Sequence, residues 1–410
     1  MALRMDRDKS IERFVGMMWM KLEEICTVFT DGDWIESKDQ SDDGIRLVQT
    51  GNIGEGIYLE KEARAKYISE ETFGKLKCTE IFPGDILVSR LPDPVGRACI
   101  IPEREERMIT AVDCTICRPN ESIISKEYLC YFMRSSAYFK RLLGSVTGTT
   151  RKRISRKNLG NVELEVPSKD RQIDVVEQLD CLVKTIESRK QELQLLDTLI
   201  KARFVEMFGN PDINENNWNT YKMEQLCEVG SSKRIYQNEQ SMTGIPFLRI
   251  SDLVNRMDTG SKDSDLFIPE ERFEELKEQG LVPESGDILL TARGTLGRCY
   301  IIQDNDEFYF QDGMITWLSK YDVKITPLYI SYLFEMPGFR KQIDSLQAGS
   351  TVAYLSISMT KKLDIMVPPL ELQNEFSDFV HQVDKSKSAI EKELKKTQIL
   401  FDSLMQKYFG

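Results

Sequence analysis

The chain has 410 residues, with 55 Lys and Arg against 66 Asp and Glu, and 41% of its residues are hydrophobic. At about 100–200 residues per domain, this length predicts two or three domains, and the composition is typical of a soluble globular protein. No apolar run approaches the roughly 18–20 residues that span a bilayer, and the N-terminal sequence MALRMDRDKSIERF is too charged for a secretory signal. We therefore expect a cytoplasmic protein that does not enter the membrane.

The residue types that dominate catalytic and metal sites are scarce. The single histidine, His381, lies in a helical stretch and is interpreted as a solvated helix residue, whereas catalytic triads and two-His metal sites need a histidine beside other reactive groups. The one CxxC, Cys114–Cys117, has no second pair at a zinc spacing. The glycines of Gly51–Gly56 are in the wrong order for a dinucleotide fingerprint, and there is no GxxxxGK[ST] loop. The composition favours a binding protein with no metal or cofactor of its own.

Comparison of the chain with itself indicates an internal duplication. Six short motifs of the first half recur in the second half at a shift of 201 or 202 residues, and so many matches at one near-constant offset predict two copies of one unit. The matched pairs are Glu23–Cys26 and Glu224–Cys227, Gly84–Arg90 (GDILVSR) and Gly286–Arg293 (GDILLTAR), Gly96-Arg97 and Gly297-Arg298, Gly148–Thr150 and Gly349–Thr351, Val166-Pro167 and Val367-Pro368, and Phe208-Gly209 and Phe409-Gly410.

Each copy has the same internal order, a mixed α/β region followed by a long helix. Short β-branched runs broken by Gly, Pro and Asp predict strands, and residues 126–143 and 327–343 predict short helices among them. The fold class is therefore expected to be α+β, with two duplicated mixed α/β domains separated by two long antiparallel coiled-coil helices. The expected boundaries are an N-terminal extension (1–18), a first mixed domain (19–166), a long helix (167–209), a linker (210–217), a second mixed domain (218–367) and a second long helix (368–410).

The two long helices carry a heptad pattern. Seven of nine positions between Val175 and Arg203, and eight of ten between Phe376 and Tyr408, are apolar at alternating spacings of three and four residues. Such a pattern produces one apolar seam per helix, and two seams in one chain can cover each other most simply as an antiparallel pair. About 35 residues at 1.5 Å per residue give a rod of roughly 50 Å. Apolar residues off the seam are candidates for binding partner helices: Leu195, Leu199, Phe204, Phe379 and Leu400.

A basic segment in the first copy is a candidate for contact with DNA phosphates. Residues 128–162 contain eight basic residues and no acidic one. At its centre, small hydroxyl residues stand beside a dense group of cations, a combination suited to a phosphate-facing loop. The candidate residues are Arg151, Lys152, Arg153, Arg156 and Lys157 in the first copy, and Lys361 and Lys362 in the equivalent, less basic stretch of the second.

The motif Gly-Asp-Ile-Leu followed by Arg and Gly-Arg supplies a second set of candidates. The Gly-Asp pair is interpreted as a turn that launches a strand, beyond which Arg90 and Arg97, or Arg293 and Arg298, stand near glycine-rich turns. Arginine on a short rigid loop is suited to guanine O6 and N7 or to phosphate. Arg249, which follows an apolar strand of the second copy, is a weaker candidate, and surface arginines at a structural turn remain an alternative for all of them.

Taken together, these features resemble the specificity (S) subunits of type I restriction–modification enzymes. The resemblance rests on the two-fold repeat, the motifs GDILVSR and GDILLTARGTLGRC, the Gly-Thr-Thr and Gly-Ser-Thr loops before Val-Pro, and the heptad helix that closes each copy, and it covers residues 19–410. It implies two target-recognition domains that each read one half of a bipartite, asymmetric DNA site. It also implies that the two helices set the gap between the half-sites and dock two methyltransferase (modification) subunits, through which restriction subunits join.

The resemblance implies that this chain itself is not an enzyme. The methyltransferase motif Asn/Asp-Pro-Pro-Tyr/Phe is absent, since Asn210-Pro211-Asp212 departs from it at the third position, so S-adenosylmethionine belongs to the partner subunit. The alternative function is that of a coiled-coil scaffold that binds proteins rather than DNA, which the acidic second half of the chain keeps open. Residues 1–17, with Arg13-Phe14-Val15 echoing Arg203-Phe204-Val205, are either a helical remnant beside the rod or an upstream start that is not used.

Overall fold

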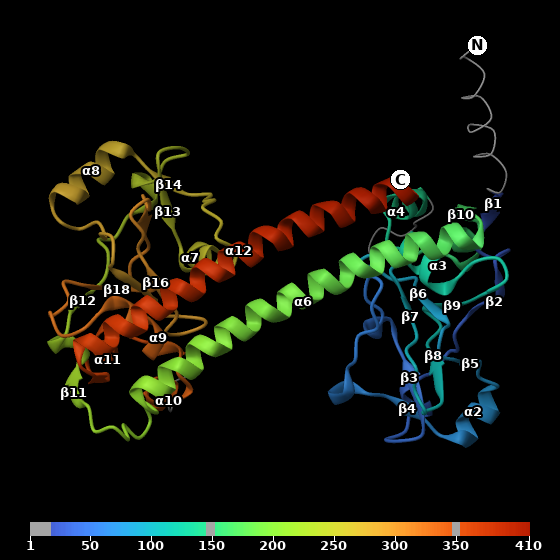
Figure 1. The fold of residues 1–410 in the computed structure, drawn as a ribbon, viewed down its shortest axis with the longest axis horizontal. Helices are drawn as coiled ribbons and strands as arrows, with labels where there is room; N and C mark the ends of the chain where they lie inside the picture. Colours follow the sequence, from blue (N-terminus) through green and yellow to red (C-terminus); the bar gives the residue numbers. More distant parts are fainter. Residues whose placement is uncertain (1–17, 145–151, 347–352) are drawn as a thin grey trace, which may run out of the picture. The chain divides into compact units, whose positions relative to one another are not determined.

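The computed structural model describes residues 18–144, 152–346 and 353–410 (Figure 1). The chain forms two compact units: unit 1 combines Met1–Arg189 with Lys392–Gly410, and unit 2 is Lys190–Glu391. Each unit therefore contains one mixed domain and one end of each of two long helices, α6 (Lys169–Phe208) and α12 (Leu370–Phe409). No helix in the described ranges is long and apolar enough to cross a membrane.

Unit 1 is built on two four-stranded sheets and a two-stranded ribbon. One sheet is antiparallel, in the order β2-β9-β6-β7, and the other has the order β4-β3-β8-β5 with β3 and β8 parallel, while β1 pairs with β10. The central strand β6 is buried at every residue, because the sheet is covered on both faces. The strands are β1 (Met18–Lys21), β2 (Cys26–Asp31), β3 (Ile45–Val48), β4 (Tyr67–Ile68), β5 (Glu80–Ile81), β6 (Ile86–Ser89), β7 (Ala98–Ile100), β8 (Met108–Thr110), β9 (Cys114–Pro119) and β10 (Glu163–Val166).

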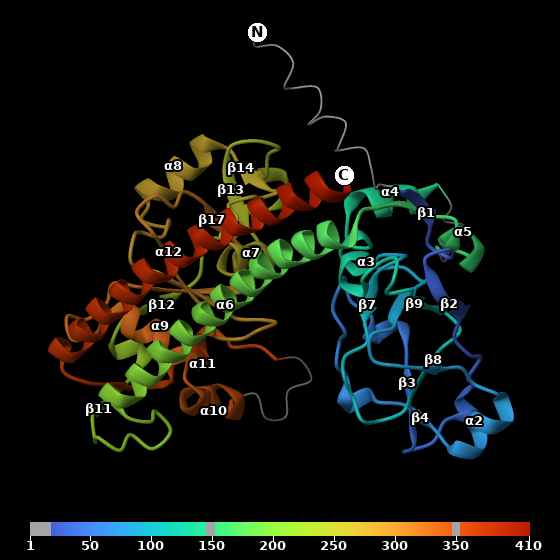
Figure 2. The same cartoon turned by 45° about the vertical axis from the view of Figure 1, so that its right-hand side comes forward.

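Four short helices of unit 1 lie beside these strands (Figure 2). Each begins after a serine whose hydroxyl accepts a hydrogen bond from the helix backbone, the preferred N-cap arrangement. The segment predicted as one helix over 126–143 is two helices, because the chain breaks at Met133–Ser135 and Ser135 caps the second of them. The helices are α2 (Glu70–Leu76), α3 (Lys126–Phe132), α4 (Ser136–Leu143) and α5 (Arg156–Gly160).

Unit 2 repeats this architecture. Its sheets have the orders β12-β18-β15-β16 and β14-β13-β17, and β11 pairs with β19. The strands are β11 (Asn219–Lys222), β12 (Glu228–Gly230), β13 (Ile245–Leu248), β14 (Phe267–Ile268), β15 (Ile288–Thr291), β16 (Cys299–Ile301), β17 (Tyr309–Phe310), β18 (Ile315–Ser319) and β19 (Asp364–Val367). The helices are α7 (Ile250–Thr259), α8 (Glu270–Glu278), α9 (Pro327–Glu335), α10 (Pro337–Ser345) and α11 (Ile357–Lys361).

The duplication predicted from the sequence is confirmed at the level of strand register. Met18 pairs with Val166 in the ribbon of unit 1, and Asn219 pairs with Val367 in that of unit 2, so both partners have moved by 201 residues. The predicted turn at Gly-Asp is also present in both copies, since Gly84 and Gly286 each have a φ of 89° immediately before a buried strand. A positive φ is a conformation that glycine adopts without steric cost.

The long helices run antiparallel within each unit. In unit 1 the hydroxyl of Tyr408 donates to Gln178 at 2.8 Å, and Arg189 donates to the Glu393 carbonyl at 2.7 Å. In unit 2, Lys387 pairs with Asp197 at 2.6 Å. In unit 1, α6 residues with higher numbers therefore contact α12 residues with lower numbers, as in an antiparallel pair. None of the predicted seam positions on either helix is exposed. The heptad prediction is thereby confirmed.

Candidate nucleic-acid interface

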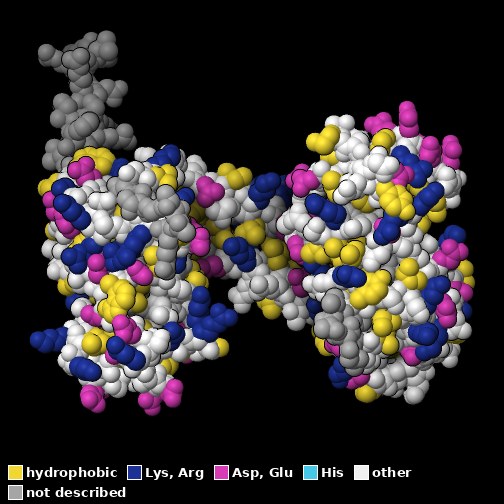
Figure 3. Space-filling view, turned by 180° about the vertical axis from the view of Figure 1, so that it is seen from behind, with side chains coloured by type: hydrophobic (Ala, Val, Ile, Leu, Met, Phe, Trp, Pro, Cys, Tyr) yellow, Lys and Arg dark blue, Asp and Glu magenta, His cyan; other side chains and the backbone are white. Residues whose placement is uncertain are grey.

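The basic segment of the first repeat lies at the surface of unit 1. Lys152 and Arg153 precede α5, Arg156 and Lys157 are its first residues, and all four side chains are exposed. On the face drawn in Figure 3, Lys and Arg side chains stand among Asp and Glu side chains on both units.

Part of the predicted phosphate-facing loop lies outside the described residues. Arg151 and residues 148–150 belong to this part, as do residues 349–351 of the second repeat. The assignment of Arg151 to DNA contact stays a prediction.

Two acids from distant parts of the chain reach the basic segment. Arg153 pairs with Asp113 at 3.0 Å, and Arg156 lies 3.8 Å from Asp31, with 47% of each arginine side chain exposed. The basic segment itself contains no acidic residue, but Asp113 and Asp31 partly neutralise its positive charge in the folded chain.

Arg90 has a structural position. Its side chain is 6% exposed, donates to the Val112 carbonyl at 2.5 Å and lies 3.3 Å from Asp31. Burial lowers the pKa of this guanidinium, and the pairing with Asp31 partly offsets that effect. The expected contact with DNA does not fit this geometry, because the donors of Arg90 face into the domain.

Arg97 is likewise used inside unit 1. Its guanidinium donates to backbone carbonyls at distances of 2.6 to 3.2 Å, from two separate loops. The accepting residues are Thr50, Ile53, Leu91, Pro92 and Pro94. Arg97 therefore ties the loop after β3 to the loop after β6, and the expected base contact is replaced by a structural role.

The second repeat places its arginines differently because the motif is one residue longer. Ala292 takes the position of Arg90: its N–H donates to the Met314 carbonyl at 2.9 Å, as that of Arg90 donates to the Asp113 carbonyl at 2.9 Å. Arg293 comes one residue later, and successive residues of an extended strand point to opposite sides. The expected equivalence of Arg90 and Arg293 is therefore wrong.

This shift leaves Arg293 exposed, with its guanidinium 5.0 Å from the centre of the Tyr354 ring. Arg298 is the counterpart of Arg97 but pairs with Asp258 at 2.6 Å, with 28% of its side chain exposed. Of the four arginines in the two motifs, Arg293 is the one whose side chain the structure leaves at the surface.

The remaining candidates lie on helix ends of unit 2. Arg249 precedes α7 and binds Asp252 through two nitrogens at 2.9 and 3.1 Å, with 41% of its side chain exposed. Lys361 is the last residue of α11 and Lys362 is the exposed residue that follows. Among the described residues, these side chains do not gather with Arg293 through any contact that would form one site.

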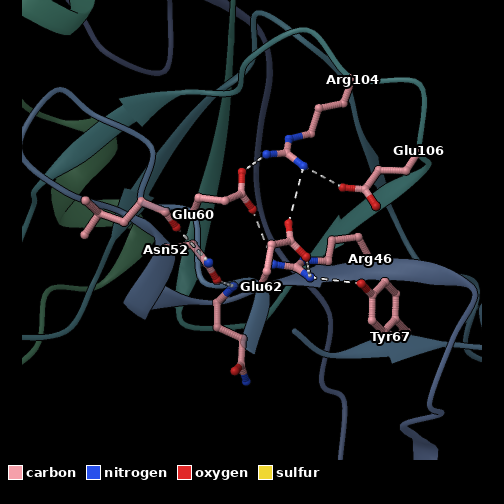
Figure 4. A network of polar contacts seen from close by, with 9 residues as sticks. Arg46, Asn52, Glu60, Glu62, Tyr67, Arg104 and Glu106 are labelled. Carbon is pink, nitrogen blue, oxygen red and sulfur yellow. Dashed lines mark hydrogen bonds and ion pairs between the residues drawn. The ribbon is translucent and has the colours of Figure 1, made fainter. Parts of the chain in front are cut away.

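Sequence reasoning missed a charge network around the buried Arg46 in unit 1. Figure 4 shows Arg46 of β3 and Arg104 of the loop after β7 beside Glu60 and Glu62. Arg46 is 1% exposed, donates to the hydroxyl of Tyr67 at 3.1 Å, and lies 3.7 Å from both Glu60 and Glu62. Arg104 also pairs with Glu60. The only sequence signal was a single arginine inside the otherwise apolar strand Ile45–Val48.

A corresponding network holds α7 in unit 2. Arg256 of α7 pairs with Asp306 and donates to the hydroxyl of Tyr300 at 3.0 Å, and the side chains of Arg256 and Asp306 are 5% and 1% exposed. Burial alone would raise the pKa of Asp306, but hydrogen bonds from the Gln303 backbone and Tyr300, together with the charge of Arg256, lower it.

The two networks fix segments that differ between the repeats. We call residues 49–66 and 249–266 the variable segments; they join β3 to β4 and β13 to β14. The first contains a short 3-10 turn at Thr50–Asn52, whereas the second contains the ten-residue helix α7. In unit 1 the segment supplies carboxylates to scaffold arginines. In unit 2 it supplies Arg256 to the scaffold carboxylate of Asp306, and it also supplies Asp258 to the scaffold arginine Arg298.

The predicted partner-binding residues separate into exposed and buried ones. Leu195, Leu199 and Leu400 are 60%, 48% and 49% exposed. Phe379 is partly buried. Phe204 is 0% exposed and lies in the core of unit 2, 5.4 Å from the Tyr329 ring. The expected outward position of Phe204 is wrong, because α9 packs on α6 and buries a face wider than the heptad seam.

Comparison with known proteins agrees with this architecture. A family model described as the type I restriction modification DNA specificity domain matches residues 15–198 and 215–399. A Haemophilus influenzae protein provisionally named a type I restriction enzyme specificity subunit is 27% identical over 236 residues, which are 56% of this chain and 57% of that protein. The aligned part of this chain thus spans little more than half the length of that relative.

Two solved structures share the fold. A chain from a structure on complex assembly and conformational transition of the type I restriction–modification system has a TM-score of 0.59 and 16% identity, covering 96% of this chain and 98% of that chain. The crystal structure of a type I restriction–modification S subunit from M. genitalium has a TM-score of 0.53 and 14% identity, covering 100% of this chain and 98% of that chain. Since the family model matches both repeats over most of the sequence, the chain belongs to the type I restriction–modification specificity subunits, with two recognition domains.

Proposed function

We propose that this chain is the non-catalytic DNA-recognition subunit of a methyltransferase complex, and that each recognition domain reads one half of a bipartite, asymmetric site. The observation that carries the proposal is the pair of scaffolds with matched strand register and different variable segments. Two copies of one scaffold bind the same polymer in the same way, and different segments on them give each copy its own sequence preference.

Exposed cations on both units supply the sequence-independent part of the affinity. In unit 1 these are Lys152, Arg153, Arg156 and Lys157, and in unit 2 they are Arg293 and Lys362, with Lys361 half-buried beside them. Lys and Arg contacts to phosphates position a protein on the duplex and release counterions, whereas base-edge contacts give specificity. Reading of bases then falls to the variable segments, which the ion pairs of Arg46 in unit 1 and of Arg256 in unit 2 hold in place.

The long helices act as the spacer and the docking surface for two methyltransferase subunits. Leu199 and Leu400 are equivalent positions of the two repeats and are exposed to nearly the same extent, 48% and 49%. Equivalent apolar positions on two helices suit two copies of one partner. S-adenosylmethionine binds to those partners, and restriction subunits join through the same complex.

Methylome sequencing of a host that expresses this chain with its methyltransferase partner tests the function. We expect one asymmetric motif of two short halves separated by a fixed gap. Exchange of residues 19–166 for another recognition domain is expected to change one half only, with the same exchange of residues 218–367 as the matched control for the other half. A methylome without any motif that depends on this chain, together with no selective protection of DNA, would leave a protein-binding scaffold as the function.

A further inference from the structure

An open cavity of about 880 Å³ lies in unit 2 beside the turn that launches β15. Asp287 of that turn lines it, together with Glu284, Trp317, Ser319 and two lysines. Asp287 is 9% exposed, although its side chain borders an open volume. The first repeat shows what such a carboxylate binds in this fold.

In unit 1 the equivalent carboxylate holds a guanidinium. Arg118 of β9 donates through Nε to Oδ1 of Asp85 at 2.7 Å and through Nη2 to Oδ2 at 2.8 Å. The guanidinium also lies 4.8 Å from the centre of the Phe82 ring. This is a bidentate, charge-assisted contact on a carboxylate whose side chain is 2% exposed.

Strand register identifies Ser319 as the counterpart of Arg118. Ile86 pairs with Cys117 in unit 1, and Ile288 pairs with Leu318 in unit 2. Arg118 follows Cys117, and Ser319 follows Leu318, so each stands across from the aspartate that precedes the isoleucine. The second repeat therefore has the carboxylate but has replaced the arginine that covers it by a serine.

The exchange leaves one oxygen of Asp287 without a partner. The backbone N–H of Glu284 and the indole N–H of Trp317 both donate to Oδ2, at 2.9 and 2.8 Å. Within the described residues, Oδ1 accepts no hydrogen bond and Asp287 has no ion-pair partner. Lys320, the nearest basic residue of the same strand end, is paired with Glu228 at 2.9 Å instead. Burial raises the pKa of Asp287, and the hydrogen bonds from Glu284 and Trp317 and the charge of Lys320 offset this rise only in part.

The charge of the lining favours a cation over a phosphate. Four carboxylates border the cavity, against two ammonium groups. The carboxylates belong to Glu224, Glu228, Glu284 and Asp287, and the ammonium groups to Lys320 and Lys361. A volume of this size takes a small molecule or a few residues of a polypeptide.

We propose that this cavity binds a guanidinium group, which pairs with Asp287 in the place that the Arg118 side chain occupies in the first repeat. The group comes from a free arginine-like molecule or from an arginine side chain of a partner polypeptide. Trp317 provides an aromatic wall beside the carboxylate, as Phe82 does for Arg118. This binding is independent of DNA reading, and its test does not involve DNA.

Agmatine, an amine that carries a guanidinium, is the probe for the first source. We expect calorimetric titration of the full chain at low salt to show agmatine binding that Ser319→Arg and Asp287→Asn each weaken by about tenfold or more, because each removes a charge-assisted contact. Ser319→Ala, which leaves the cavity open, is the matched control and is expected to bind as the unaltered chain does. Since Asp287 also holds the turn, circular dichroism checks the fold of Asp287→Asn, and Ser319→Arg tests the same contact without touching the turn.

Arg118→Ser provides the reciprocal test in unit 1. It opens the equivalent site, and agmatine is expected to raise the melting temperature of this variant by more than it raises that of the unaltered chain. Tetramethylammonium at equal ionic strength, which has the charge but no hydrogen-bond donor, is expected to give no such rise.

Co-purification with the methyltransferase partner addresses the second source. If agmatine does not bind the unaltered chain but Ser319→Arg and Asp287→Asn both weaken assembly while Ser319→Ala does not, the guanidinium belongs to the partner. Equal agmatine affinity in the unaltered chain and Ser319→Arg overturns the proposal. So does an absence of agmatine binding combined with normal assembly of both charge variants.

Discussion

Arg256 and Asp306 form an ion pair in which the two side chains are 5% and 1% exposed, and it joins the variable segment of the second recognition domain to its scaffold. Removing one member of such a pair leaves the other buried and uncompensated. We expect Arg256→Met to lower the free energy of unfolding by about 3–5 kcal/mol, measured by urea denaturation. Lys277→Met, which removes a pair with 59% of each side chain exposed, is the control and is expected to cost less than about 1 kcal/mol.

The same pair predicts a dependence of stability on pH. The pKa of Asp306 is lower in the folded chain than in the unfolded chain, where it is about 3.9. The charged Asp306 therefore adds to the free energy of unfolding above about pH 3.9, and this contribution is lost as the pH falls further. Arg256 and Lys262, which lies 3.6 Å from Asp306, are the cations that face it, and Tyr300 stays neutral in this range. The stability difference between the unaltered chain and Arg256→Met is therefore expected to shrink between about pH 4 and pH 2. A difference that stays constant over this range would contradict the assignment.

Arg97 is expected to matter for stability rather than for DNA affinity. Its guanidinium holds two loops through their carbonyl groups, and a lysine cannot reproduce that fork of donors. Arg97→Lys is expected to destabilise unit 1 by about 2 kcal/mol, with the salt dependence of DNA binding unchanged. A flatter salt dependence in a normally folded variant would return Arg97 to the DNA interface.

The exposed cations around α5 are expected to show the opposite behaviour. Replacing Lys152, Arg153 and Lys157 by alanine should weaken binding to many sequences alike and reduce the slope of log affinity against log salt by about 2–3. Sequence preference should not change. Lys75→Ala, an exposed lysine of α2, is the control, and an unaltered slope in the triple variant would remove the segment from the interface.

The spacer prediction can be tested by changing the length of α6. An insertion of four residues in this helix adds about 6 Å and more than one turn. We expect it to alter the tolerated gap between half-sites or to abolish assembly. The same insertion in the linker 210–217 is the control, and normal methylation of the original site by the α6 variant would show that the helix does not set the gap.

Leu199 and Leu400 are expected to act in parallel. Leu199→Lys or Leu400→Lys alone should weaken binding of one methyltransferase subunit, and the double variant should lose both, as measured by the mass of the purified complex. Leu76→Lys, a 36% exposed leucine of α2, is the control. Retention of both subunits by the double variant would place docking elsewhere.

The duplication and the heptad seam could be predicted because both are properties of spacing along the chain. The roles of Arg90 and Arg293 could not, because the extra residue in the second motif is visible in the sequence but does not show which of the two arginines faces the interior. The burial of Phe204 depends on α9, whose contact with α6 joins residues more than one hundred positions apart.

The variable segments illustrate the same limit. Arg46 meets carboxylates 14 and 16 residues away, and Arg104 belongs to a loop much further along the chain. The two carboxylates and Arg104, taken singly, have the appearance of ordinary surface charges in the sequence, and Arg46 differs from them only because it lies inside an apolar strand. Only the folded sheet brings them together, and only comparison of the two repeats shows that the second variable segment adds a buried arginine, Arg256, to this kind of contact.

The core of unit 1 includes Phe401, Met405 and Phe409 from the far end of α12. During synthesis on the ribosome, the first recognition domain must therefore wait, with part of its interior uncovered, until the second domain and Phe409 have been made. A premature stop anywhere between α6 and the end of α12 would remove part of the core of the domain that is translated first. Nascent chains of this protein are therefore expected to need chaperones for longer than a chain of the same length whose domains fold independently.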